Sequence, residues 1–568
     1  MKADSDIWLR QYFVDRLGAL DRERAGWLGT WRELAGQFAP RRGRFPGTPG
    51  DPRRGRFPGT PGDSHRGSRG DDNILDNTPL LAARIMASGM MAGISSPARP
   101  WFRLRVADMG LADPGTASDP AARAWLDEVQ KRLLHVFARS NLYNCLHTLY
   151  GELGIFGTAA LWVDEDEEDV VRGYVLTAGE YWLASSRRLA VDTLYRTLSW
   201  TARQIVDSFG RTAVSPAIAS AYDQGRFDAE FEIVHALEPN PRATVGGLAP
   251  GGAEGTGSWH GNVPAHFPYR SVWFERTAQG ERALLRISGY EEFPCMAPRW
   301  EVTGADTWGS GPGWIALGDA LQLQAQQRLK ARVLELQANP PMVAPPSLKN
   351  EPASLLPGGV TYVADPAGQY FRPAVDIRVD LGALGADIAQ VQARVRSAFY
   401  ADLFLMMAES DRRSVTAREI DERHEEKMLM LGPVLERLHD ELLDPLVARV
   451  FNIMARQGLL PEPPPSLLAM QTRGRRLQLE FISLLAQAQK SVATGAIERF
   501  WRFGTTIGAL KPEALDRLDT DGTIDAYAEM TGVPASVVVD RQRAEALRTM
   551  RLAALPAAPL PLPRPGKG

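Results

Sequence analysis

Residues 416–457 read TAREIDERHEEKMLMLGPVLERLHDELLDPLVARVFNIMARQ, and their apolar side chains return every three or four positions. This spacing places them on one face of an α-helix and predicts a long helix from Thr416 to about Gln457. Pro433 and Pro445 lie inside the pattern and should bend it, because proline lacks the backbone donor and its ring meets the preceding turn. The apolar positions are Ile420, Met428, Leu431, Leu435, Leu438, Leu442, Leu446, Val450 and Met454. Such a helix suits a stalk or a ring more than a compact pocket.

Two shorter helical patterns come before this helix, on either side of a proline- and glycine-rich stretch at 339–375. The first runs through Gln337, is amphipathic and stops at Asn339-Pro340-Pro341. Its apolar stripe consists of Leu317, Leu321, Ala325, Leu329, Val333 and Leu336. The second runs from about Ile388 to Met406 and is followed by a polar segment. We therefore expect a pair of helices, then a loop, then the long helix.

The N-terminal half of the chain mixes helical patterns with short alternating strands, which indicates an α+β fold. Thr78 is the expected N-cap of one helix, with Pro79 in its first turn. Gly89 and Gly93 in that helix form a GxxxG pattern, which in a globular chain indicates close helix packing. The other expected elements are helices at 1–40 and 121–138, an antiparallel β region at 155–200, and strands at 101–106 and 271–275.

Six consecutive acids, Asp164 to Asp169, separate two strand-like runs of the β region. Clustered carboxylates can bind Ca²⁺ or Mg²⁺, but the glycine and the final glutamate of an EF-hand loop are missing. A hairpin tip is also where such a run is readily solvated. We favour the solvated turn and keep a divalent-metal site as the alternative.

A tandem repeat is the least expected feature of the chain. Residues 41–52 (RRGRFPGTPGDP) recur at 53–64 (RRGRFPGTPGDS), with eleven of twelve positions identical. Glycine and proline at this density exclude a helix or a central strand, so the repeat is expected to be an exposed loop. Its arginines can contact phosphates. A duplication in a loop that tolerates insertion is the simpler interpretation.

Composition places the chain among globular proteins of several units. It has 568 residues, 44% of them hydrophobic and 23% charged. Lys and Arg number 65 against 68 Asp and Glu, so no global positive field draws the protein onto nucleic acid. The only cysteines, Cys145 and Cys295, are far apart and are expected to be buried thiols in a reducing compartment. No secretion signal or membrane-spanning segment is expected.

The sequence motifs of the common enzyme classes are missing. There is no GxxxxGK[ST] phosphate cradle, no GxSxG elbow and no HExxH. The glycine-rich run Gly309 to Gly313 contains Pro312, which removes an amide donor, so it is expected to be a turn. We therefore expect no enzyme, no cofactor and no metal.

Three groups of segments together resemble the portal, or head-to-tail connecting, proteins of short-tailed bacteriophages. They are 97–104; 154–160 with 178–184; and 416–420 with 431–438, 441–446 and 456–461. The order and spacing of these segments extend over roughly residues 1–470. The third group is the most specific.

The resemblance implies an α+β portal fold and a ring of about twelve identical subunits at one capsid vertex. It implies that double-stranded DNA passes through the ring without sequence-specific contacts and that terminase, major capsid protein and tail adaptors are partners. The protein would be made in the host cytoplasm and would end in the virion. Implied parts are a wing (1–310), stem helices (311–338 and 384–406), a clip (339–383), a tunnel loop (407–415), a spine helix (416–470), a helical crown (471–540) and a C-terminal tail (541–568).

Two groups of site residues follow from these assignments. The tunnel loop, as the DNA-facing candidate, contains Met407, Glu409, Ser410, Asp411, Arg412, Arg413 and Ser414. The clip, as the partner-docking candidate, contains Pro345, Lys349, Glu351 and Tyr362. The loop arginines can meet the DNA backbone, with the acids limiting the grip, or these charges can pair between neighbouring subunits. A channel that passes any sequence needs no base-reading contacts, and the near-neutral net charge agrees with that.

Two other classes of protein stay open at this point. One is a different virion structural protein, such as a tail adaptor or scaffold. The other is a nuclease or hydrolase that uses the acidic run at 164–169 with a divalent metal.

Overall fold

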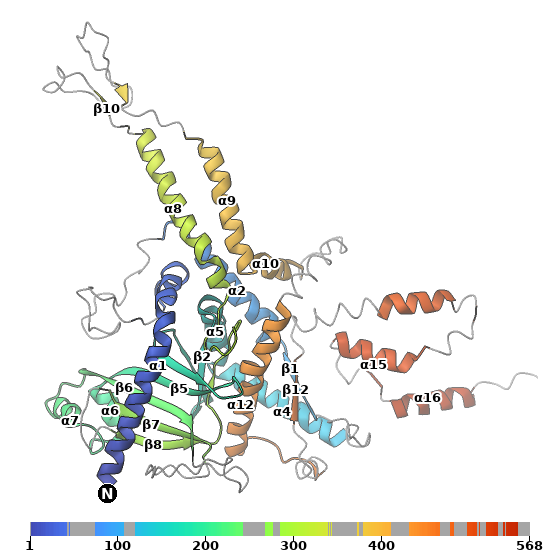
Figure 1. The fold of residues 1–568 in the computed structure, drawn as a ribbon. Helices are drawn as coiled ribbons and strands as arrows, with labels where there is room; N and C mark the ends of the chain where they lie inside the picture. The colour runs from blue at the N-terminus through green and yellow to red at the C-terminus, as the bar shows by residue number, and fades with distance from the viewer. Residues whose placement is uncertain are drawn as a thin grey trace, which may run out of the picture. The chain divides into compact units, whose positions relative to one another are not determined.

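The computed structural model describes residues 2–42, 45, 74–106, 120–241, 267–276, 284–338, 340, 342–343, 372–373, 379–410, 431–465, 477–481, 497–507, 511, 518–531, 538–539 and 541–554 (Figure 1). These fall into two compact units. The first comprises Met1–Met91, Glu128–Ser414 and Pro433–Glu462; the second comprises Ala92–Asp127, Val415–Gly432 and Pro463–Gly568. Each unit is described by itself. No described helix is long and apolar enough to cross a membrane.

Helices and strands alternate along the chain, which confirms the α+β class. The helices of eight or more residues are α1 (Lys2–Phe38), α2 (Thr78–Ile94), α4 (Pro120–Arg139), α5 (Leu142–Phe156), α6 (Ala202–Phe209), α7 (Pro216–Asp223), α8 (Pro312–Ala338), α9 (Leu381–Ala398), α10 (Ala401–Ser410), α12 (Asp444–Arg456), α15 (Thr520–Thr531) and α16 (Arg541–Ala554), together with the unlabelled helical runs 431–438 and 497–507. The strands are β1 (Phe102–Val106), β2 (Ala160–Asp166), β3 (Val170–Leu176), β4 (Tyr181–Ser185), β5 (Val191–Thr201), β6 (Glu230–Pro239), β7 (Tyr269–Glu275), β8 (Leu284–Tyr290), β9 (Cys295–Met296), β10 (Met342–Val343), β11 (Arg372–Pro373) and β12 (Leu477–Phe481).

A five-stranded antiparallel sheet in the order β4-β5-β6-β7-β8 carries the main core of the first unit. Alternate residues of a strand point to opposite faces, so each face of this sheet has its own apolar cluster. The long helix α1 packs Phe13 and Leu17 on one face, against Tyr195 and Phe274 (Figure 1). Helices α6 and α7 cover another cluster, which includes Ile233. The expected N-terminal helix is therefore confirmed, and its stripe is a packing stripe.

The expected antiparallel β region is also confirmed, and it is joined by a third strand. Strands β2 and β3 form a hairpin with Ala160 opposite Leu176, and β9 pairs with the other edge of β2.

Cys145 and Cys295 are both buried, and burial raises their thiol pKa values to about 11 and about 12. They are packed, unreactive thiols, as the sequence predicts.

The described part of the expected long helix is not uniform. Residues 431–438 are helical, a π-helical turn follows at His439–Leu443, and α12 then runs to Arg456. In that turn the backbone N–H of Asp444 reaches the carbonyl of His439, five residues back. The expected distortion near Pro445 thus takes the form of a π turn immediately before it, because proline cannot donate to a regular ladder. Residues 416–430 lie outside the described residues.

One expectation about the start of a helix is wrong by a small margin. Thr78 is the first residue of α2 instead of its N-cap. The backbone N–H of Thr78 donates to the Asp76 carboxylate at 2.8 Å. The first part of the segment assigned as the C-terminal tail forms α16 as far as Ala554, since it carries good helix formers such as Ala544, Leu547 and Arg548. Residues 555–568 lie outside the described residues.

The second unit contains a two-stranded sheet as well as helices. Strand β1 pairs antiparallel with β12, with Phe102 opposite Phe481. The prediction of a wholly helical crown over 471–540 is therefore wrong at β12, whose sequence LQLEF alternates with the period of a strand. The described helical segments, 497–507 and α15, agree with the rest of that prediction.

Candidate functional site: the α8–α9 helical hairpin

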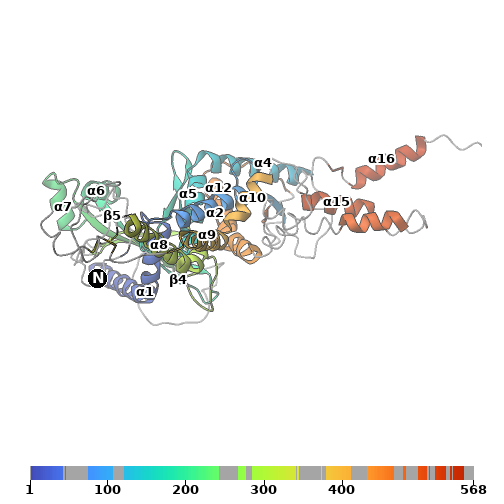
Figure 2. The same cartoon turned by 90° about the horizontal axis from the view of Figure 1, so that it is seen from above.

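Helices α8 and α9, which include most of the residues expected to form the stem pair, lie side by side and run antiparallel (Figures 1 and 2). Leu323 of α8 packs against Ile388 and Val391 of α9. Arg394 pairs with Asp319 at 2.8 Å toward one end of the contact, and Gln326 donates to Asp387 toward the other. The apolar seam and the polar contacts beside it hold the two helices in one register.

The apolar stripe predicted for α8 is not the face that packs on α9. Ala316, Ala320 and Leu323 are buried, whereas the side chains of Leu321 and Leu329 are 44% and 56% exposed. Within the predicted stripe, Val333 is also buried and Leu317 and Leu336 are half-buried, so the part left uncovered by the described residues is Leu321 and Leu329, with Ala325 between them.

A buried polar cluster ties the hairpin to the start of α2. The Asp76 carboxylate accepts from Gln327 of α8 at 2.9 Å and from Gln392 of α9 at 2.8 Å. Gln324, 3% exposed, accepts from the backbone N–H of Asp76 at 3.0 Å and donates to its carbonyl at 2.9 Å. Burial acts to raise the pKa of Asp76, but the hydrogen bonds from Thr78, Gln392 and Gln327 together lower it.

Sequence reasoning did not single out Asp76 or its glutamine partners. The available signal was Gln324, a polar side chain beside apolar positions in an amphipathic helix. A polar residue there is either solvated or hydrogen-bonded, and its spacing alone does not decide between the two.

The glycine-rich run at 309–313 forms the base of α8. A Cβ added at Gly313 would lie 2.4 Å from the carbonyl oxygen of Ile155, so only glycine fits against the end of α5. The indole of Trp314 donates to the carbonyl of Phe156 at 3.2 Å. The run is thus a close-packed junction between α5 and α8. The expected turn is not formed, because Ser310 bridges to Glu301 and Pro312 and Gly313 already belong to α8.

The second stem helix is interrupted. Helix α9 ends at Ala398, Tyr400 has a left-handed backbone with φ of 54°, and α10 begins at Ala401. Phe404 of α10 then packs on Gly89 of α2, where a Cβ would meet its ring at 2.2 Å. That contact confirms the expected close packing at the GxxxG pattern.

Three residues expected in the tunnel loop are helical instead. Met407, Glu409 and Ser410 form the end of α10, because the sequence there has strong helix formers and no glycine or proline. Asp411, Arg412, Arg413 and Ser414 lie outside the described residues, as do the clip candidates Pro345, Lys349, Glu351 and Tyr362.

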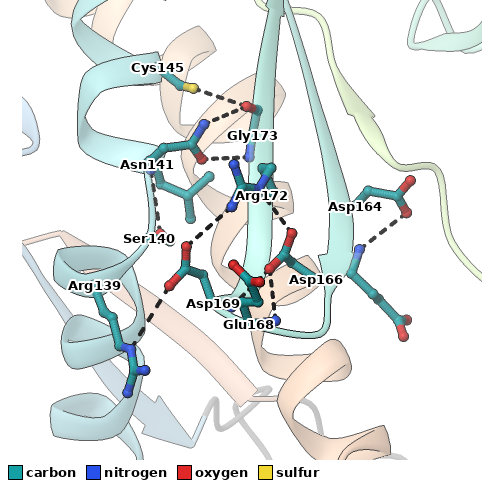
Figure 3. Close-up of polar contacts among 12 residues, drawn as sticks. Arg139, Ser140, Asn141, Cys145, Asp164, Asp166, Glu168, Asp169, Arg172 and Gly173 are labelled. Carbon is teal, nitrogen blue, oxygen red and sulfur yellow. Dashed lines mark hydrogen bonds and ion pairs between the residues drawn. The ribbon is translucent and has the colours of Figure 1, made fainter. Parts of the chain in front are cut away.

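The acidic run at 164–169 forms the tip of the β2–β3 hairpin (Figure 3). Asp166 accepts from the backbone N–H groups of Glu168 and Asp169 at 3.0 and 2.9 Å, which closes the turn. Its other oxygen pairs with Arg172 at 2.9 Å, and Asp169 pairs with Arg172 at 3.4 Å. The carboxylates thus bind backbone amides and arginines, and within the described ranges no group of His, Cys, Asp and Glu is arranged to hold a metal ion.

Helix α12 is fastened to the same hairpin by charge. Arg456 pairs with Glu165 at 2.6 Å, and the buried Arg449 pairs with Glu292 at 2.9 Å. Asn452 donates to the second oxygen of Glu292 at 2.6 Å. Glu165 of the hairpin and Glu292 after β8 therefore both take part in holding α12 in place.

Comparison with known proteins identifies the family of the chain. The model of the bacteriophage head to tail connecting proteins matches residues 10–539. The chain belongs to this family. It is 40% identical to a portal protein of Salmonella phage epsilon15, over 95% of this chain and 91% of that protein, and the same figures hold for a probable portal protein of Bordetella phage BPP-1. Two gene transfer agent particle structures, a native virion and an empty neck, align at 12% identity over 81% of this chain and 90% of theirs, with TM-scores of 0.31 and 0.33.

Membership in the head-to-tail connecting family confirms the portal function predicted from the sequence. The function is structural and not enzymatic, which removes the nuclease or hydrolase alternative. As a connecting protein, the chain is a component of the phage particle at the junction of head and tail.

Proposed function

We propose that about twelve copies of this chain close into a ring at one capsid vertex. In this proposal the α8–α9 hairpins surround a central channel that carries double-stranded DNA. The clip region at 339–383 docks terminase during packaging and tail adaptors afterwards, and the wing meets the major capsid protein. Assembly takes place in the host cytoplasm.

The exposure of Leu321 and Leu329 on α8 is the observation that carries this proposal. Exposed leucines at positions 321 and 329 are costly to leave in water, and each would gain by burial against another surface. A repeated head-to-tail contact between identical subunits buries such a stripe on every copy, and it closes into a ring when its rotation allows.

The rigid attachment of the hairpin supports the same role. The Asp76 cluster joins both helices to α2, and the Gly313 junction joins α8 to α5. A channel wall that passes a moving polymer must keep its shape, and these two attachments restrain the base of the hairpin.

The near-neutral net charge of −3 supports passage without tight binding of phosphates. We propose that Arg412 and Arg413 touch the DNA backbone from the segment after α10. The other interpretation, in which Glu409, Asp411 and these arginines pair between subunits, predicts a different result in the experiment below.

The test replaces Arg412 and Arg413 together by glutamine in the full chain. If they touch DNA, rings should form normally, and the amount of DNA packaged or retained per particle should change. If they pair between subunits, ring formation itself should fail. Arg211→Gln is the matched control, because it removes an exposed arginine that pairs with Asp223 between α6 and α7.

A further inference from the structure

The first copy of the tandem repeat is seated on helix α5. Its Arg42 donates to the carbonyl of Thr148 at 3.3 Å and lies 3.6 Å from the Glu152 carboxylate. Its Phe45 stacks edge-on against Phe156, with ring centroids 6.3 Å apart. One turn of α5 separates Thr148 from Glu152 and another separates Glu152 from Phe156, so the three partners follow one face of the helix.

The surface of α5 is shaped for these two side chains. A Cβ added at Gly151 would lie 3.0 Å from the Arg42 guanidinium, so glycine leaves room for the arginine to lie against the helix. Glu152 is 2% exposed, and its other partners are the Thr177 hydroxyl at 3.0 Å and the Ala178 N–H at 3.4 Å. Arg42 supplies positive charge to a buried acid that otherwise has only neutral donors among these contacts.

The second copy of the repeat has the same residues at the same spacing. Arg54 and Phe57 correspond to Arg42 and Phe45, and the only difference between the copies is Pro52 against Ser64, outside the contacting residues. The chain on either side is anchored at Phe38 and at Ile74, which are both buried. If the second copy docks in place of the first, the connection from Phe38 to the docked motif becomes longer and the connection from the docked motif to Ile74 becomes shorter.

The cost of that exchange is small. Loop-closure entropy grows only with the logarithm of loop length, and comparing the two connections gives about a fourfold preference for the first copy. The preference for the first copy agrees with the copy that is seated in the structure, and it leaves the second copy as an accessible substitute.

We propose that this face of α5 is a docking site for the Arg-Gly-Arg-Phe motif and that both copies of the repeat are ligands for it. The duplication then provides a spare ligand for the attachment that fixes the end of α1 to α5. It is more than an insertion that the loop tolerates.

The experiment compares four proteins: Arg42→Ala in the full-length chain, Arg54→Ala, the double replacement, and Arg42→Ala in a chain that lacks only residues 53–64. Thermal unfolding and hydrogen exchange of the α5 amides at 148–156 are measured for each protein. Arg41→Ala, an exposed neighbour in the same motif, and deletion of 53–64 alone are the controls.

Each single replacement should leave the melting temperature and α5 protection close to those of the natural chain. The double replacement, and Arg42→Ala without the second copy, should both lower the melting temperature by a few degrees and speed exchange in α5. Equal losses for Arg42→Ala with and without residues 53–64 would show that the second copy does not dock. A loss on deleting 53–64 alone would mean that loop length matters instead, and it would overturn the proposal as well.

Discussion

Glu152 is a buried acid in the middle of the first unit, and its ionisation opposes folding. Burial raises its pKa to about 7, although Arg42, Thr177 and Ala178 act to lower it, and Glu180 adds to the rise. Because the folded protein holds this proton more tightly than the unfolded chain, the contribution to stability is present below about pH 4.5 and is lost as the pH rises to about 7.

Replacing Glu152 by Gln should remove this pH dependence, since glutamine mimics the protonated acid and does not titrate. The free energy of unfolding of Glu152→Gln relative to the natural chain should therefore rise between pH 4.5 and 7, by up to about 3 kcal/mol. Denaturant unfolding across that range measures it, with Glu168→Gln at the exposed hairpin tip as control. A difference that does not change with pH would contradict the assignment.

Asp76 offers a second prediction at this scale. Asp76→Asn keeps the shape of the side chain but replaces one acceptor oxygen by an NH₂ group, which then faces either the Thr78 N–H or the donors of Gln327 and Gln392, so it should cost about 1–3 kcal/mol of unfolding free energy. Asp319→Asn breaks the more exposed pair with Arg394 and should cost less than about 1 kcal/mol. Urea unfolding compares the two; equal costs would mean that the Asp76 cluster is not a special attachment.

Individual residues were the least predictable part of the protein. The turn formed by the acidic run could be predicted because a hairpin tip is where carboxylates are readily solvated. The burial of the two cysteine thiols could be predicted because the cysteines are far apart in the sequence. Asp76 and Arg42 did not, because each acts on a partner far away in the chain. Asp76 and Gln392 are so far apart in the sequence that no local pattern predicts their contact.

Among the elements, α8 shows what local sequence determines and what tertiary packing determines. Its periodicity predicted the helix, and its proline-rich end predicted the stop near Ala338. Periodicity also indicated an apolar stripe, but the residue of α8 that packs on Ile388 and Val391 of α9 is Leu323, which lies outside that stripe. The break at Tyr400 and the π turn before Asp444 depend on backbone states that no short pattern specifies.

The junction at the base of α8 can be tested with two glycines of the same helix. Gly313→Ala should destabilise the protein by more than about 1 kcal/mol, because its Cβ would meet the Ile155 carbonyl at 2.4 Å. Gly318→Ala has nothing within 4 Å of its added Cβ and should stabilise the helix by about 0.5–1 kcal/mol. Thermal unfolding of both variants gives the signs; a stabilising Gly313→Ala would rule out the close-packed junction.

The family relationship and the fold class were predictable for the whole molecule, because both depend on long segments whose order is preserved. The assembly was less accessible, since the sequence shows a leucine stripe without showing what covers it. The structure leaves Leu321 and Leu329 of α8 exposed, and this exposure is the physical basis for proposing a ring.

The stripe also gives a variant that separates folding from assembly. Replacing Leu321 and Leu329 by Ser should leave the melting temperature of the isolated subunit nearly unchanged, because both side chains are already exposed. The same change should weaken association between subunits, as seen in sedimentation. Unaltered assembly would place the subunit contact on another surface.

The mass of the purified full-length protein in solution, with electron micrographs of the same sample, tests the central claim most directly. We predict closed rings with an axial hole and a mass about twelve times that of the 62.4 kDa subunit. A sample that stays monomeric, or forms only open assemblies at every protein concentration, would contradict the ring and the channel together.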